Sequence, residues 1–401
     1  MRVLQINTIY KDKSTGRTCW ELEKKLVEQG HQCVTAFGHG AVCGGNTYRI
    51  NSNIEYMLHN ILSRITGLEG YFSYFATKRL VKFIGKYSPD IIHLRNLHGH
   101  YLNLPLLFKY LKKSKIPVVM HLHDCWIFTG KCCYPVYNNC DKWQTQCSDC
   151  PSRKVYPVSY CFDFSKKMHK DKMKWFSELE SCTVVGVSDW IAGEGKKSYL
   201  GRFPVTRVYN WINTDVFHPY PDAKKSDFGL DDDKFTLVFS GASWLNASSK
   251  VKDLLSLADT LDDDTQILLI GKTEEGLSHP KIKLAGFVGD VETLAKMYAV
   301  GDAYVHVSTA DTFGKVIAEA MACGIPAVVY NNTACPELVT EGCGAAVEPH
   351  DIEQLKRELQ IIKKNGKSFY TEKCTRRVKS SFSYDGNVQQ TLGIYSELIS
   401  K

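Results

Sequence analysis

The chain of 401 residues lacks the features that mark several large classes of protein. No apolar run approaches the ~18 residues that a membrane-spanning helix needs. The first residues, MRVLQIN, have the pattern of a short strand and lack the longer apolar stretch of a secretory signal. There is no internal repeat, no P-loop, no Ser-His-Asp pattern and no recognisable nucleic-acid-binding module. We therefore expect a cytoplasmic protein that has no nucleic-acid partner.

The composition that is present is typical of a folded globular protein. Hydrophobic residues make up 44% of the chain and charged residues 23%, with 29 Gly and 13 Pro. At roughly 150 residues per domain, the length predicts two or three domains. The 15 Cys are expected to be mostly reduced or metal-bound, because the cytoplasm disfavours disulfides.

Charge is divided unevenly between the two halves of the chain. Residues 1–208 carry 30 Lys and Arg against 16 Asp and Glu, whereas residues 209–401 carry 20 against 27. The basic half indicates a phosphate-bearing partner or a membrane surface. An uneven but solvated surface is the alternative.

Strands and helices alternate along both halves. Residues 3–7, 31–37, 90–94, 117–122 and 183–187 read as strands of the first half, and 235–240, 266–270, 303–307 and 327–330 as strands of the second; residues 18–29, 250–261 and 315–323 read as helices. This alternation predicts two doubly wound α/β domains with parallel sheets, residues 1–208 and 209–401, with ligands outside the carboxyl ends of the strands. Residues 219–234 are the expected linker.

The most informative segment begins at Asp311 and continues through Phe313-Gly314-Lys315 to Glu319. A loop of residues 308–314 joins a strand to a helix, whose free N–H groups and dipole suit a diphosphate. Glu319 lies five residues into this helix, roughly 7.5 Å along its axis. That is the distance at which a carboxylate meets the ribose of a bound nucleotide. An acidic helix face beside a turn is the alternative reading.

This segment, with Glu-Ala-Met-Ala-Cys-Gly-Ile-Pro at residues 319–326, resembles the carboxylate-x7-Glu signature of family 4 retaining glycosyltransferases. Residues 14–17 and 210–219 resemble further segments of that family. The resemblance implies a GT-B fold, which is two facing Rossmann-like domains with a cleft between them, no catalytic metal and a nucleotide-sugar donor on the second domain. It implies donor-binding roles for Gly16, Arg17, Gly241, Lys250, Thr312, Phe313, Gly314, Lys315 and Glu319, and catalytic roles for His123, Asp311 and Glu319.

Two positions depart from the family pattern. Asp311 replaces the usual first Glu, which shortens the reach of the carboxylate but keeps its charge. Ser249-Lys250-Val251 stands where related sequences have Arg-Lys-Gly, so Lys250 is the remaining phosphate-neutralising cation.

Polar residues also gather at strand ends in the first half. His123 follows the strand of residues 117–122 and resembles the family histidine that contacts the transferred sugar, with Asp124 placed to hold its tautomer. The segment of residues 91–103 offers His93, Asn96 and His98 as acceptor contacts. A hydrogen-bonded loop that supports the His123 loop is the alternative for this second cluster.

Cysteines are concentrated in an excursion of residues 125–151. Cys147-x2-Cys150, with Cys140 and either Cys132 or Cys133 upstream, has the residue types of a four-thiolate zinc site that would hold an otherwise irregular segment together. Similar segments, with His-Asp-Cys-Trp-x-Phe-Thr-Gly ahead of the cysteines, occur in a polysaccharide-assembly subgroup of the family. We expect Cys132, Cys140, Cys147 and Cys150 as the ligands of a structural zinc ion.

The aromatic segment of residues 71–75, followed by Lys78, Arg79, Lys82 and Lys86, resembles an interfacial helix with a basic flank. A buried helix with a solvated edge is the alternative. An anionic membrane surface at the inner face of the plasma membrane is therefore an expected partner, and the last helix of the chain is expected to pack back on the first domain.

The sequence as a whole predicts transfer of a hexosyl or N-acetylhexosaminyl group from a nucleotide diphosphate-sugar to a hydroxyl, with retention and without a required cofactor. The expected acceptor is a lipid-linked saccharide in capsular, exopolysaccharide or lipopolysaccharide assembly. A nucleotide-sugar epimerase or hydrolase on the same fold, and a non-catalytic sugar-binding scaffold, are the alternatives.

Overall fold

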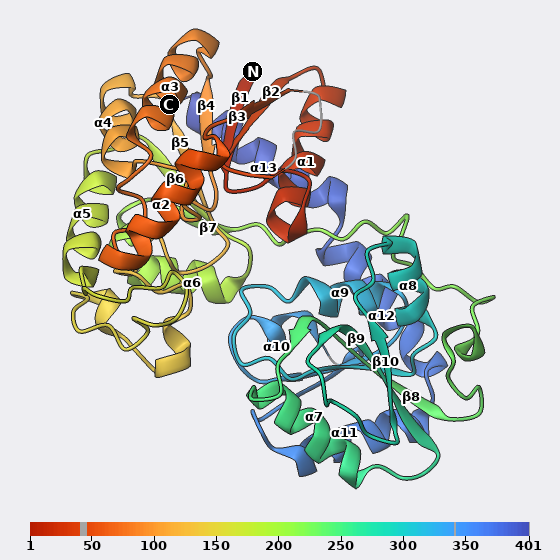
Figure 1. The fold of residues 1–401 in the computed structure, drawn as a ribbon. Helices are drawn as coiled ribbons and strands as arrows, with labels where there is room; N and C mark the ends of the chain where they lie inside the picture. The colour runs from red at the N-terminus through yellow and green to blue at the C-terminus, as the bar shows by residue number, and fades with distance from the viewer. Residues whose placement is uncertain (41–45, 341, 401) are drawn as a thin grey trace. The chain divides into compact units, whose positions relative to one another are not determined.

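The computed structural model describes residues 1–40, 46–340 and 342–400 (Figure 1). The chain divides into two compact units, one of Met1–Val208 with Val388–Lys401 and the other of Tyr209–Asn387. Each unit contains one parallel sheet with helices packed against it. In the described ranges, no helix combines the length and the apolar character needed to cross a membrane.

The first unit is built on a seven-stranded sheet in the order β3-β2-β1-β4-β5-β6-β7, with every neighbouring pair parallel. Its central strands β4, β5 and β6 are buried along their whole length, because helices cover both faces of a parallel sheet. The strand order reverses between β1 and β4, where ligands of such sheets bind. The strands are β1 (Arg2–Asn7), β2 (Gln32–Phe37), β3 (Thr47–Arg49), β4 (Ile91–Leu94), β5 (Val118–Leu122), β6 (Cys182–Gly186) and β7 (Val205–Arg207).

The helices of the first unit fill the connections between these strands. Residues 123–164, between β5 and α5, contain only the short 3-10 helices η1 (Pro135–Asn138) and η2 (Lys142–Gln144). A third 3-10 helix, η3 (Tyr199–Arg202), precedes β7. The α-helices are α1 (Lys13–Glu28), α2 (Asn53–Thr66), α3 (Tyr74–Tyr87), α4 (Leu104–Ser114), α5 (Ser165–Ser177), α6 (Asp189–Lys197) and, from Val388 onward, α13 (Tyr384–Ile399).

The second unit repeats the plan with six parallel strands in the order β10-β9-β8-β11-β12-β13, which reverses between β8 and β11. The strands are β8 (Phe235–Trp244), β9 (Thr265–Thr273), β10 (Ile282–Gly286), β11 (Ala303–His306), β12 (Ala327–Tyr330) and β13 (Gly344–Val347). The helices are η4 (Lys225–Phe228), α7 (Ser249–Thr260), α8 (Val291–Ala299), α9 (Lys315–Ala322), α10 (Cys335–Leu338), α11 (Ile352–Asn365) and α12 (Ser368–Ser381).

The doubly wound architecture predicted from the sequence is confirmed, but two local expectations are wrong. Residues 219–234 are not a linker: they lie inside the second unit, where Lys225 Nζ donates to Asp302 Oδ2 and to the Lys234 carbonyl. Helix α1 begins at Lys13, five residues before the expected start at Thr18, so Gly16 lies within its first turn.

Candidate active site

The loop between β11 and α9 lies beside the point where the second sheet reverses its strand order. Gly314 is the N-cap of α9 in the left-handed conformation, with φ 80° and ψ 52°, and within the described ranges no side-chain hydrogen bond caps the helix. A Cβ at this position would lie 2.6 Å from Ile317 Cδ1. The positive φ and this close approach favour glycine at position 314. Because no described side chain caps α9, its free amides keep the partial positive charge that attracts anions.

Asp311 is held at the tip of this loop by a chain of polar contacts that begins in β8. Ser240 Oγ lies 2.9 Å from the hydroxyls of Tyr298 and Tyr304, and Tyr304 OH lies 3.4 Å from His306 Nδ1. His306 Nε2 in turn lies 2.8 Å from Asp311 Oδ2. Sequence reasoning missed His306, whose only signal was its place as the last residue of a buried strand.

The electrostatics of the loop keep Asp311 ionised. Burial alone would raise the pKa of Asp311, but His306, Ser308 and Lys250 together outweigh it and lower the pKa. Lys250 is half-buried in the first turn of α7. Two sequence-predicted residues, Asp311 and Lys250, are thus close enough to interact.

Glu319 lies on α9 and is only 6% exposed. Its charge raises the pKa values of Tyr298 and Tyr304, on which burial is the larger influence, so the carboxylate lies near both rings. Asp311 and Glu319 therefore lie on either side of the Gly314 turn and share Tyr304 as a neighbour.

The other predicted donor residues of this unit differ in what they can offer. Phe313 is buried against Tyr209 and Phe382, so a donor role for it is limited to its backbone. Thr312 and Lys315 are half-buried in the loop and at the helix start. Gly241 lies in β8, where an added Cβ would meet the Trp244 ring at 3.4 Å.

In the first unit, the residues that follow β4 and β5 line one pocket. Its lining includes Arg95, Asn96, His98, His123 and Asp124. Parallel strands end at one edge of the sheet, which is why the two polar segments meet there. The structure thus brings together the expected sugar-contacting histidine and two of the three expected acceptor residues.

His123 is oriented by a residue that sequence reasoning did not single out. Arg95 is 1% exposed, and its Nη1 lies 3.3 Å from both His123 Nε2 and Thr18 Oγ1, while Nε and Nη2 have no hydrogen-bond partner among the residues that the structure describes. Burial lowers the pKa of His123 to about 3, and the Arg95 charge acts in the same direction. The imidazole is therefore neutral. An arginine directly after a buried strand was the available signal.

Asp124, which was expected to hold the tautomer of His123, is hydrogen-bonded to three other residues. Its Oδ2 lies 2.7 Å from His98 Nε2 and accepts from Asn96 Nδ2 at 3.2 Å, and Oδ1 accepts from the Trp126 amide. Although burial opposes it, the Asp124 charge raises the pKa of His98. His98 and Asn96 are thus parts of a hydrogen-bonded loop, as the alternative reading predicts, and they also line the pocket, so that acceptor contact stays a prediction for them.

His93 is not an acceptor contact. It is fully buried, with Nε2 at 3.1 Å from His121 Nδ1 and Nδ1 bonded to the hydroxyl of Tyr395 on α13. Both ring nitrogens are used inside the core. The sequence prediction fails because His93 lies inside β4, whose two faces are both covered, and not in the loop after the strand, where ligands bind.

Gly16 and Arg17 lie in the first turn of α1. Gly16 is buried, and an added Cβ would lie 3.2 Å from the backbone at Tyr10 and Lys11. Its small size is required first by the β1–α1 connection. Arg17 is half-buried. In the described structure, no hydrogen bond joins Gly16 or Arg17 to the pocket of Arg95 and His123. The next residue of the helix, Thr18, does reach it, because Thr18 Oγ1 accepts from Arg95 Nη1.

The four cysteines expected to bind zinc line a single pocket, together with Lys131, Lys142 and Trp143. Cys132 and Cys150 are hydrogen-bonded through their sulfurs, and Cys147 Sγ accepts from the Gly130 amide at 3.1 Å. Among the described residues, potential metal-ligand atoms lie within 4.8 Å of one another in three groups, and the four cysteines are not one of them. The groups are His59–Glu69–His100, His98–Asp124–Cys133 and His306–Asp311–Cys335. A bound zinc ion would therefore require the thiols to draw closer together.

Comparison with known proteins identifies the class. The family model described as Glycosyltransferase Family 4 matches residues 15–216, and the model described as Glycosyl transferases group 1 matches residues 222–380. The chain belongs to glycosyltransferase family 4 and is a glycosyltransferase, as its sequence motifs predict.

Individual relatives are more distant. WcaC of Escherichia coli K12, named as a glycosyl transferase of colanic acid biosynthesis, is 22% identical over 373 residues, which cover 88% of this chain and 89% of that protein. The O-antigen chain mannosyltransferase B of Escherichia coli is 32% identical over 127 residues, 31% of this chain and 32% of that protein.

Solved structures confirm the GT-B fold. Sucrose-phosphate synthase of Thermosynechococcus elongatus superposes with a TM-score of 0.72 at 16% identity and covers 100% of this chain and 99% of that one. HepE of Anabaena, solved in complex with UDP, has a TM-score of 0.68 at 15% identity over 99% of this chain and 100% of its own. HepE has also been solved with UDP-glucose.

Proposed function

We propose that this glycosyltransferase moves a sugar from a nucleoside diphosphate-sugar to a hydroxyl acceptor, with retention of the anomeric configuration and without a catalytic metal ion. The observation that carries the proposal is the arrangement of Asp311 and Glu319 on either side of the uncapped α9 start at Gly314. Carboxylates accept from sugar hydroxyls, and the amide end of a helix attracts a diphosphate.

Each residue has a role that its position supports. The start of α9 and the half-buried Lys250 and Lys315 stabilise the charge that develops on the departing diphosphate. Glu319 accepts from the two ribose hydroxyls. Asp311, kept ionised by His306 and Lys250, accepts from hydroxyls of the transferred sugar.

In the reaction, the bond between the anomeric carbon and the diphosphate oxygen breaks, and the acceptor oxygen bonds to the same face of that carbon. The acceptor proton passes to the departing phosphate oxygen, so no covalent enzyme intermediate forms. Burial and the Arg95 charge keep His123 neutral, and its uncharged imidazole contacts the transferred sugar.

The acceptor we propose is a lipid-linked saccharide in the assembly of a bacterial surface polysaccharide, at the inner face of the plasma membrane. Support comes from the names of WcaC and of the O-antigen mannosyltransferase, and from the basic first half of the chain. The UDP and UDP-glucose complexes of HepE make uridine nucleotides the first donors to test.

The direct test of the donor site is calorimetric titration with UDP. Glu319→Gln preserves the shape of a buried side chain and is expected to weaken binding by about tenfold or more, because a ribose loses two charge-assisted hydrogen bonds. Glu372→Gln, at a side chain that is 80% exposed, is the matched control and is expected to change nothing. Equal affinities in all three proteins would overturn the ribose assignment.

A further inference from the structure

Helix α2 is amphipathic, but its polar side is buried and its apolar side is exposed, the reverse of a helix that packs on a hydrophobic core. Its only buried residues are the polar His59 and Ser63. Large apolar side chains recur at every third or fourth position along its outward side, where Ile54 is 67% exposed and Ile65 still 43%. These residues, which we call the α2 apolar face, are Ile54, Met57, Leu58, Ile61, Leu62 and Ile65.

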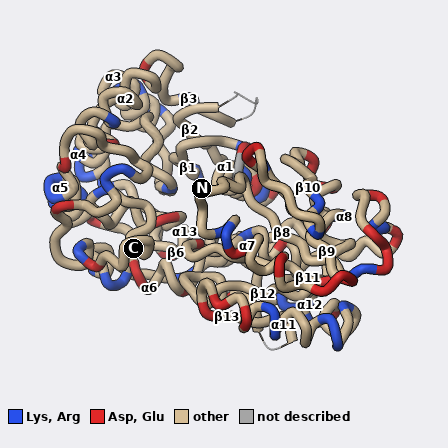
Figure 2. Tube along the Cα trace, turned by 60° about the horizontal axis from the view of Figure 1, so that its bottom comes forward, with Lys and Arg blue, Asp and Glu red and all other residues tan. Residues whose placement is uncertain are grey.

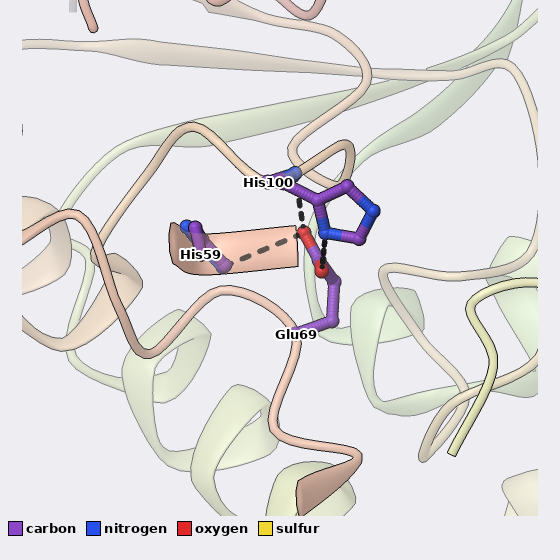
Figure 3. A group of neighbouring side chains, drawn as sticks. All are labelled: His59, Glu69 and His100. Carbon is purple, nitrogen blue, oxygen red and sulfur yellow. Dashed lines mark hydrogen bonds and ion pairs between the residues drawn. The ribbon is translucent and has the colours of Figure 1, made fainter. Parts of the chain in front are cut away.

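The inward polar side of α2 is tied to the first unit by a buried network (Figure 3). Glu69 lies against both His59 and His100, and accepts from the amides of Gly99 and His100. Ser63 Oγ lies 3.0 Å from His100 Nδ1, and His59 Nδ1 lies 2.7 Å from Ser73 Oγ.

These contacts fix which side of α2 faces out. Rotating the helix to bury its apolar side would carry His59 and Ser63 out of this network, so that buried Glu69 and His100 would each lose a polar contact, which is costly. The ends are equally defined, by a Ser52–Glu55 capping box and by Gly67 in the left-handed conformation. The packing of the first unit therefore fixes the α2 apolar face on the outside.

Further exposed aromatic side chains lie on segments that contact α2. Ser73, which contacts His59, precedes α3, whose first residues Tyr74 and Phe75 are 51% and 71% exposed. At the C-terminal end of α2, the Tyr160 amide donates to the Arg64 carbonyl, which places the exposed Tyr160 and Phe162 next to the last turn of α2.

Cations border this face. Apart from Gly85, the exposed residues of α3 after Phe75 are Lys78, Arg79, Lys82 and Lys86 at helical spacing, and α3 contains no acidic residue. Arg79 forms an ion pair with Glu55 through both carboxylate oxygens, so the basic stripe of α3 adjoins the first turn of α2. Lysines and arginines are also drawn along α4 and α5 of the same unit in Figure 2.

We propose that the α2 apolar face, with Tyr74 and Phe75, docks this enzyme on an anionic lipid bilayer, with α2 lying in the plane of the interface. Apolar side chains inserted at the acyl boundary beside lysines that meet anionic headgroups are the two contributions that such binding needs. The inference deepens the proposed function, since a bilayer is where a lipid-linked acceptor resides, but the docking itself does not depend on any reaction.

The test is co-sedimentation of the full chain with vesicles of phosphatidylcholine alone or mixed with phosphatidylglycerol in about equal parts. The wild type is expected to bind the mixed vesicles at low salt and to bind less as salt rises. Ile54→Gln with Ile61→Gln is expected to weaken partition by at least about tenfold. Lys78→Gln with Lys82→Gln is expected to weaken it about fivefold per lysine, on mixed vesicles only.

The matched control is Ile361→Gln in the second unit, because Ile361 is 50% exposed and Ile61 is 49% exposed. This control is expected to bind as the wild type does. Failure of the wild type to bind mixed vesicles, or equal binding by the α2 double variant, would overturn the proposal. So would a dimer of the wild type that the α2 variant dissociates without any change in vesicle binding, since a second copy would then cover the face.

Transfer assays separate this inference from the proposed function. The α2 double variant is expected to glycosylate a short, water-soluble acceptor at the wild-type rate and to lose activity only on an acceptor embedded in mixed vesicles. Vesicle binding without any transfer would contradict the proposed function but not the proposed docking surface.

Discussion

His306 Nε2 lies 2.8 Å from Asp311 Oδ2, so the last residue of β11 holds the carboxylate that follows five residues later in the loop. The contact fixes one oxygen of Asp311 and helps to keep the group ionised inside a largely buried site. A shorter side chain than the usual Glu is thereby given a fixed direction.

The first prediction concerns this pair. Asp311→Asn is expected to lower kcat/KM for transfer by about a hundredfold or more, because a charge-assisted hydrogen bond to the sugar is lost. His306→Gln should cause a smaller loss, since the carboxylate remains but is less well oriented. Asp263→Asn, at a fully exposed carboxylate, is the control. Wild-type kinetics in Asp311→Asn would contradict the assignment.

The second prediction concerns Arg95 as a positioning residue. Burial and the Arg95 charge both lower the pKa of His123, so Arg95→Gln is expected to raise that pKa toward its ordinary value. The rate of the variant should then begin to fall at higher pH than that of the wild type as the solution is acidified, because protonated His123 is inactive. Arg95→Lys, which keeps the charge, should restore the wild-type profile of kcat/KM against pH. Superimposable profiles for all three proteins would refute the role.

Gly314→Ala tests the helix start of α9. The positive φ disfavours any side chain by roughly 1–2 kcal/mol, and the new methyl group would meet Ile317. We expect a higher KM for the donor and a lower free energy of unfolding. Gly366→Ala at the end of α11 also has a positive φ, but its methyl group would meet nothing, so it should lower stability without changing KM. A donor KM that is unchanged in Gly314→Ala would argue against this diphosphate seat.

Stability should fall as the pH drops below neutrality. Burial lowers the pKa values of His59, to about 4, and of His93, His121 and His123. Between about pH 4 and 6.5 the unfolded chain binds protons at these residues that the folded chain does not, so His59 alone costs about 2 kcal/mol at pH 5 and the other three act in the same direction. His98 acts in the opposite direction, but it is one residue against four. Urea unfolding at pH 7 and pH 5 measures the difference, and equal free energies of unfolding would contradict it.

The zinc site remains a prediction. Gentle purification should yield about one zinc ion per chain, which a thiol-specific mercurial releases with loss of structure between residues 123 and 164. Cys147→Ser should lower the zinc content, whereas Cys161→Ser, at an exposed thiol outside the pocket, should not. Less than half an equivalent of zinc in wild-type protein would remove the idea, and a Cys132–Cys150 disulfide would replace it.

The fold could be predicted because both sheets are parallel and buried. Continuous apolar runs such as residues 118–122 are read directly as strands, and the following glycines and prolines mark the ends of helices. The start of α1 could not be predicted, because Ser14-Thr15-Gly16 has low helix propensity and the turn is closed by a local bond from the Lys11 amide to the Gly16 carbonyl.

The candidate site was predictable where function depends on the backbone and less so where it depends on packing. Gly314 and Lys315 could be placed from the strand–loop–helix order alone. Sequence could not tell that Asp124 faces His98, or that His93 is enclosed by Tyr395 from a segment some 300 residues away. Nor could it tell which side of α2 faces out: periodicity shows that a helix has two faces but not which one is buried.

Tyr71 and Phe72 illustrate the same limit. They were expected to lie on an interfacial helix, but they precede α3 and pack inward, Tyr71 through Asp171 and Phe72 against His59. The basic residues of that segment are exposed as expected, whereas the apolar surface beside them comes mostly from α2.

The central claim is that a sugar leaves a nucleoside diphosphate only to join an acceptor. Release of the free nucleotide from a panel of nucleotide sugars, measured with and without a lipid-linked saccharide, tests it most directly. We predict release that requires the acceptor, yields a product with the donor's anomeric configuration and falls sharply in Asp311→Asn. Release at the same rate without acceptor would identify a hydrolase, an altered sugar nucleotide would identify an epimerase, and binding without turnover would identify a scaffold; each would contradict the account.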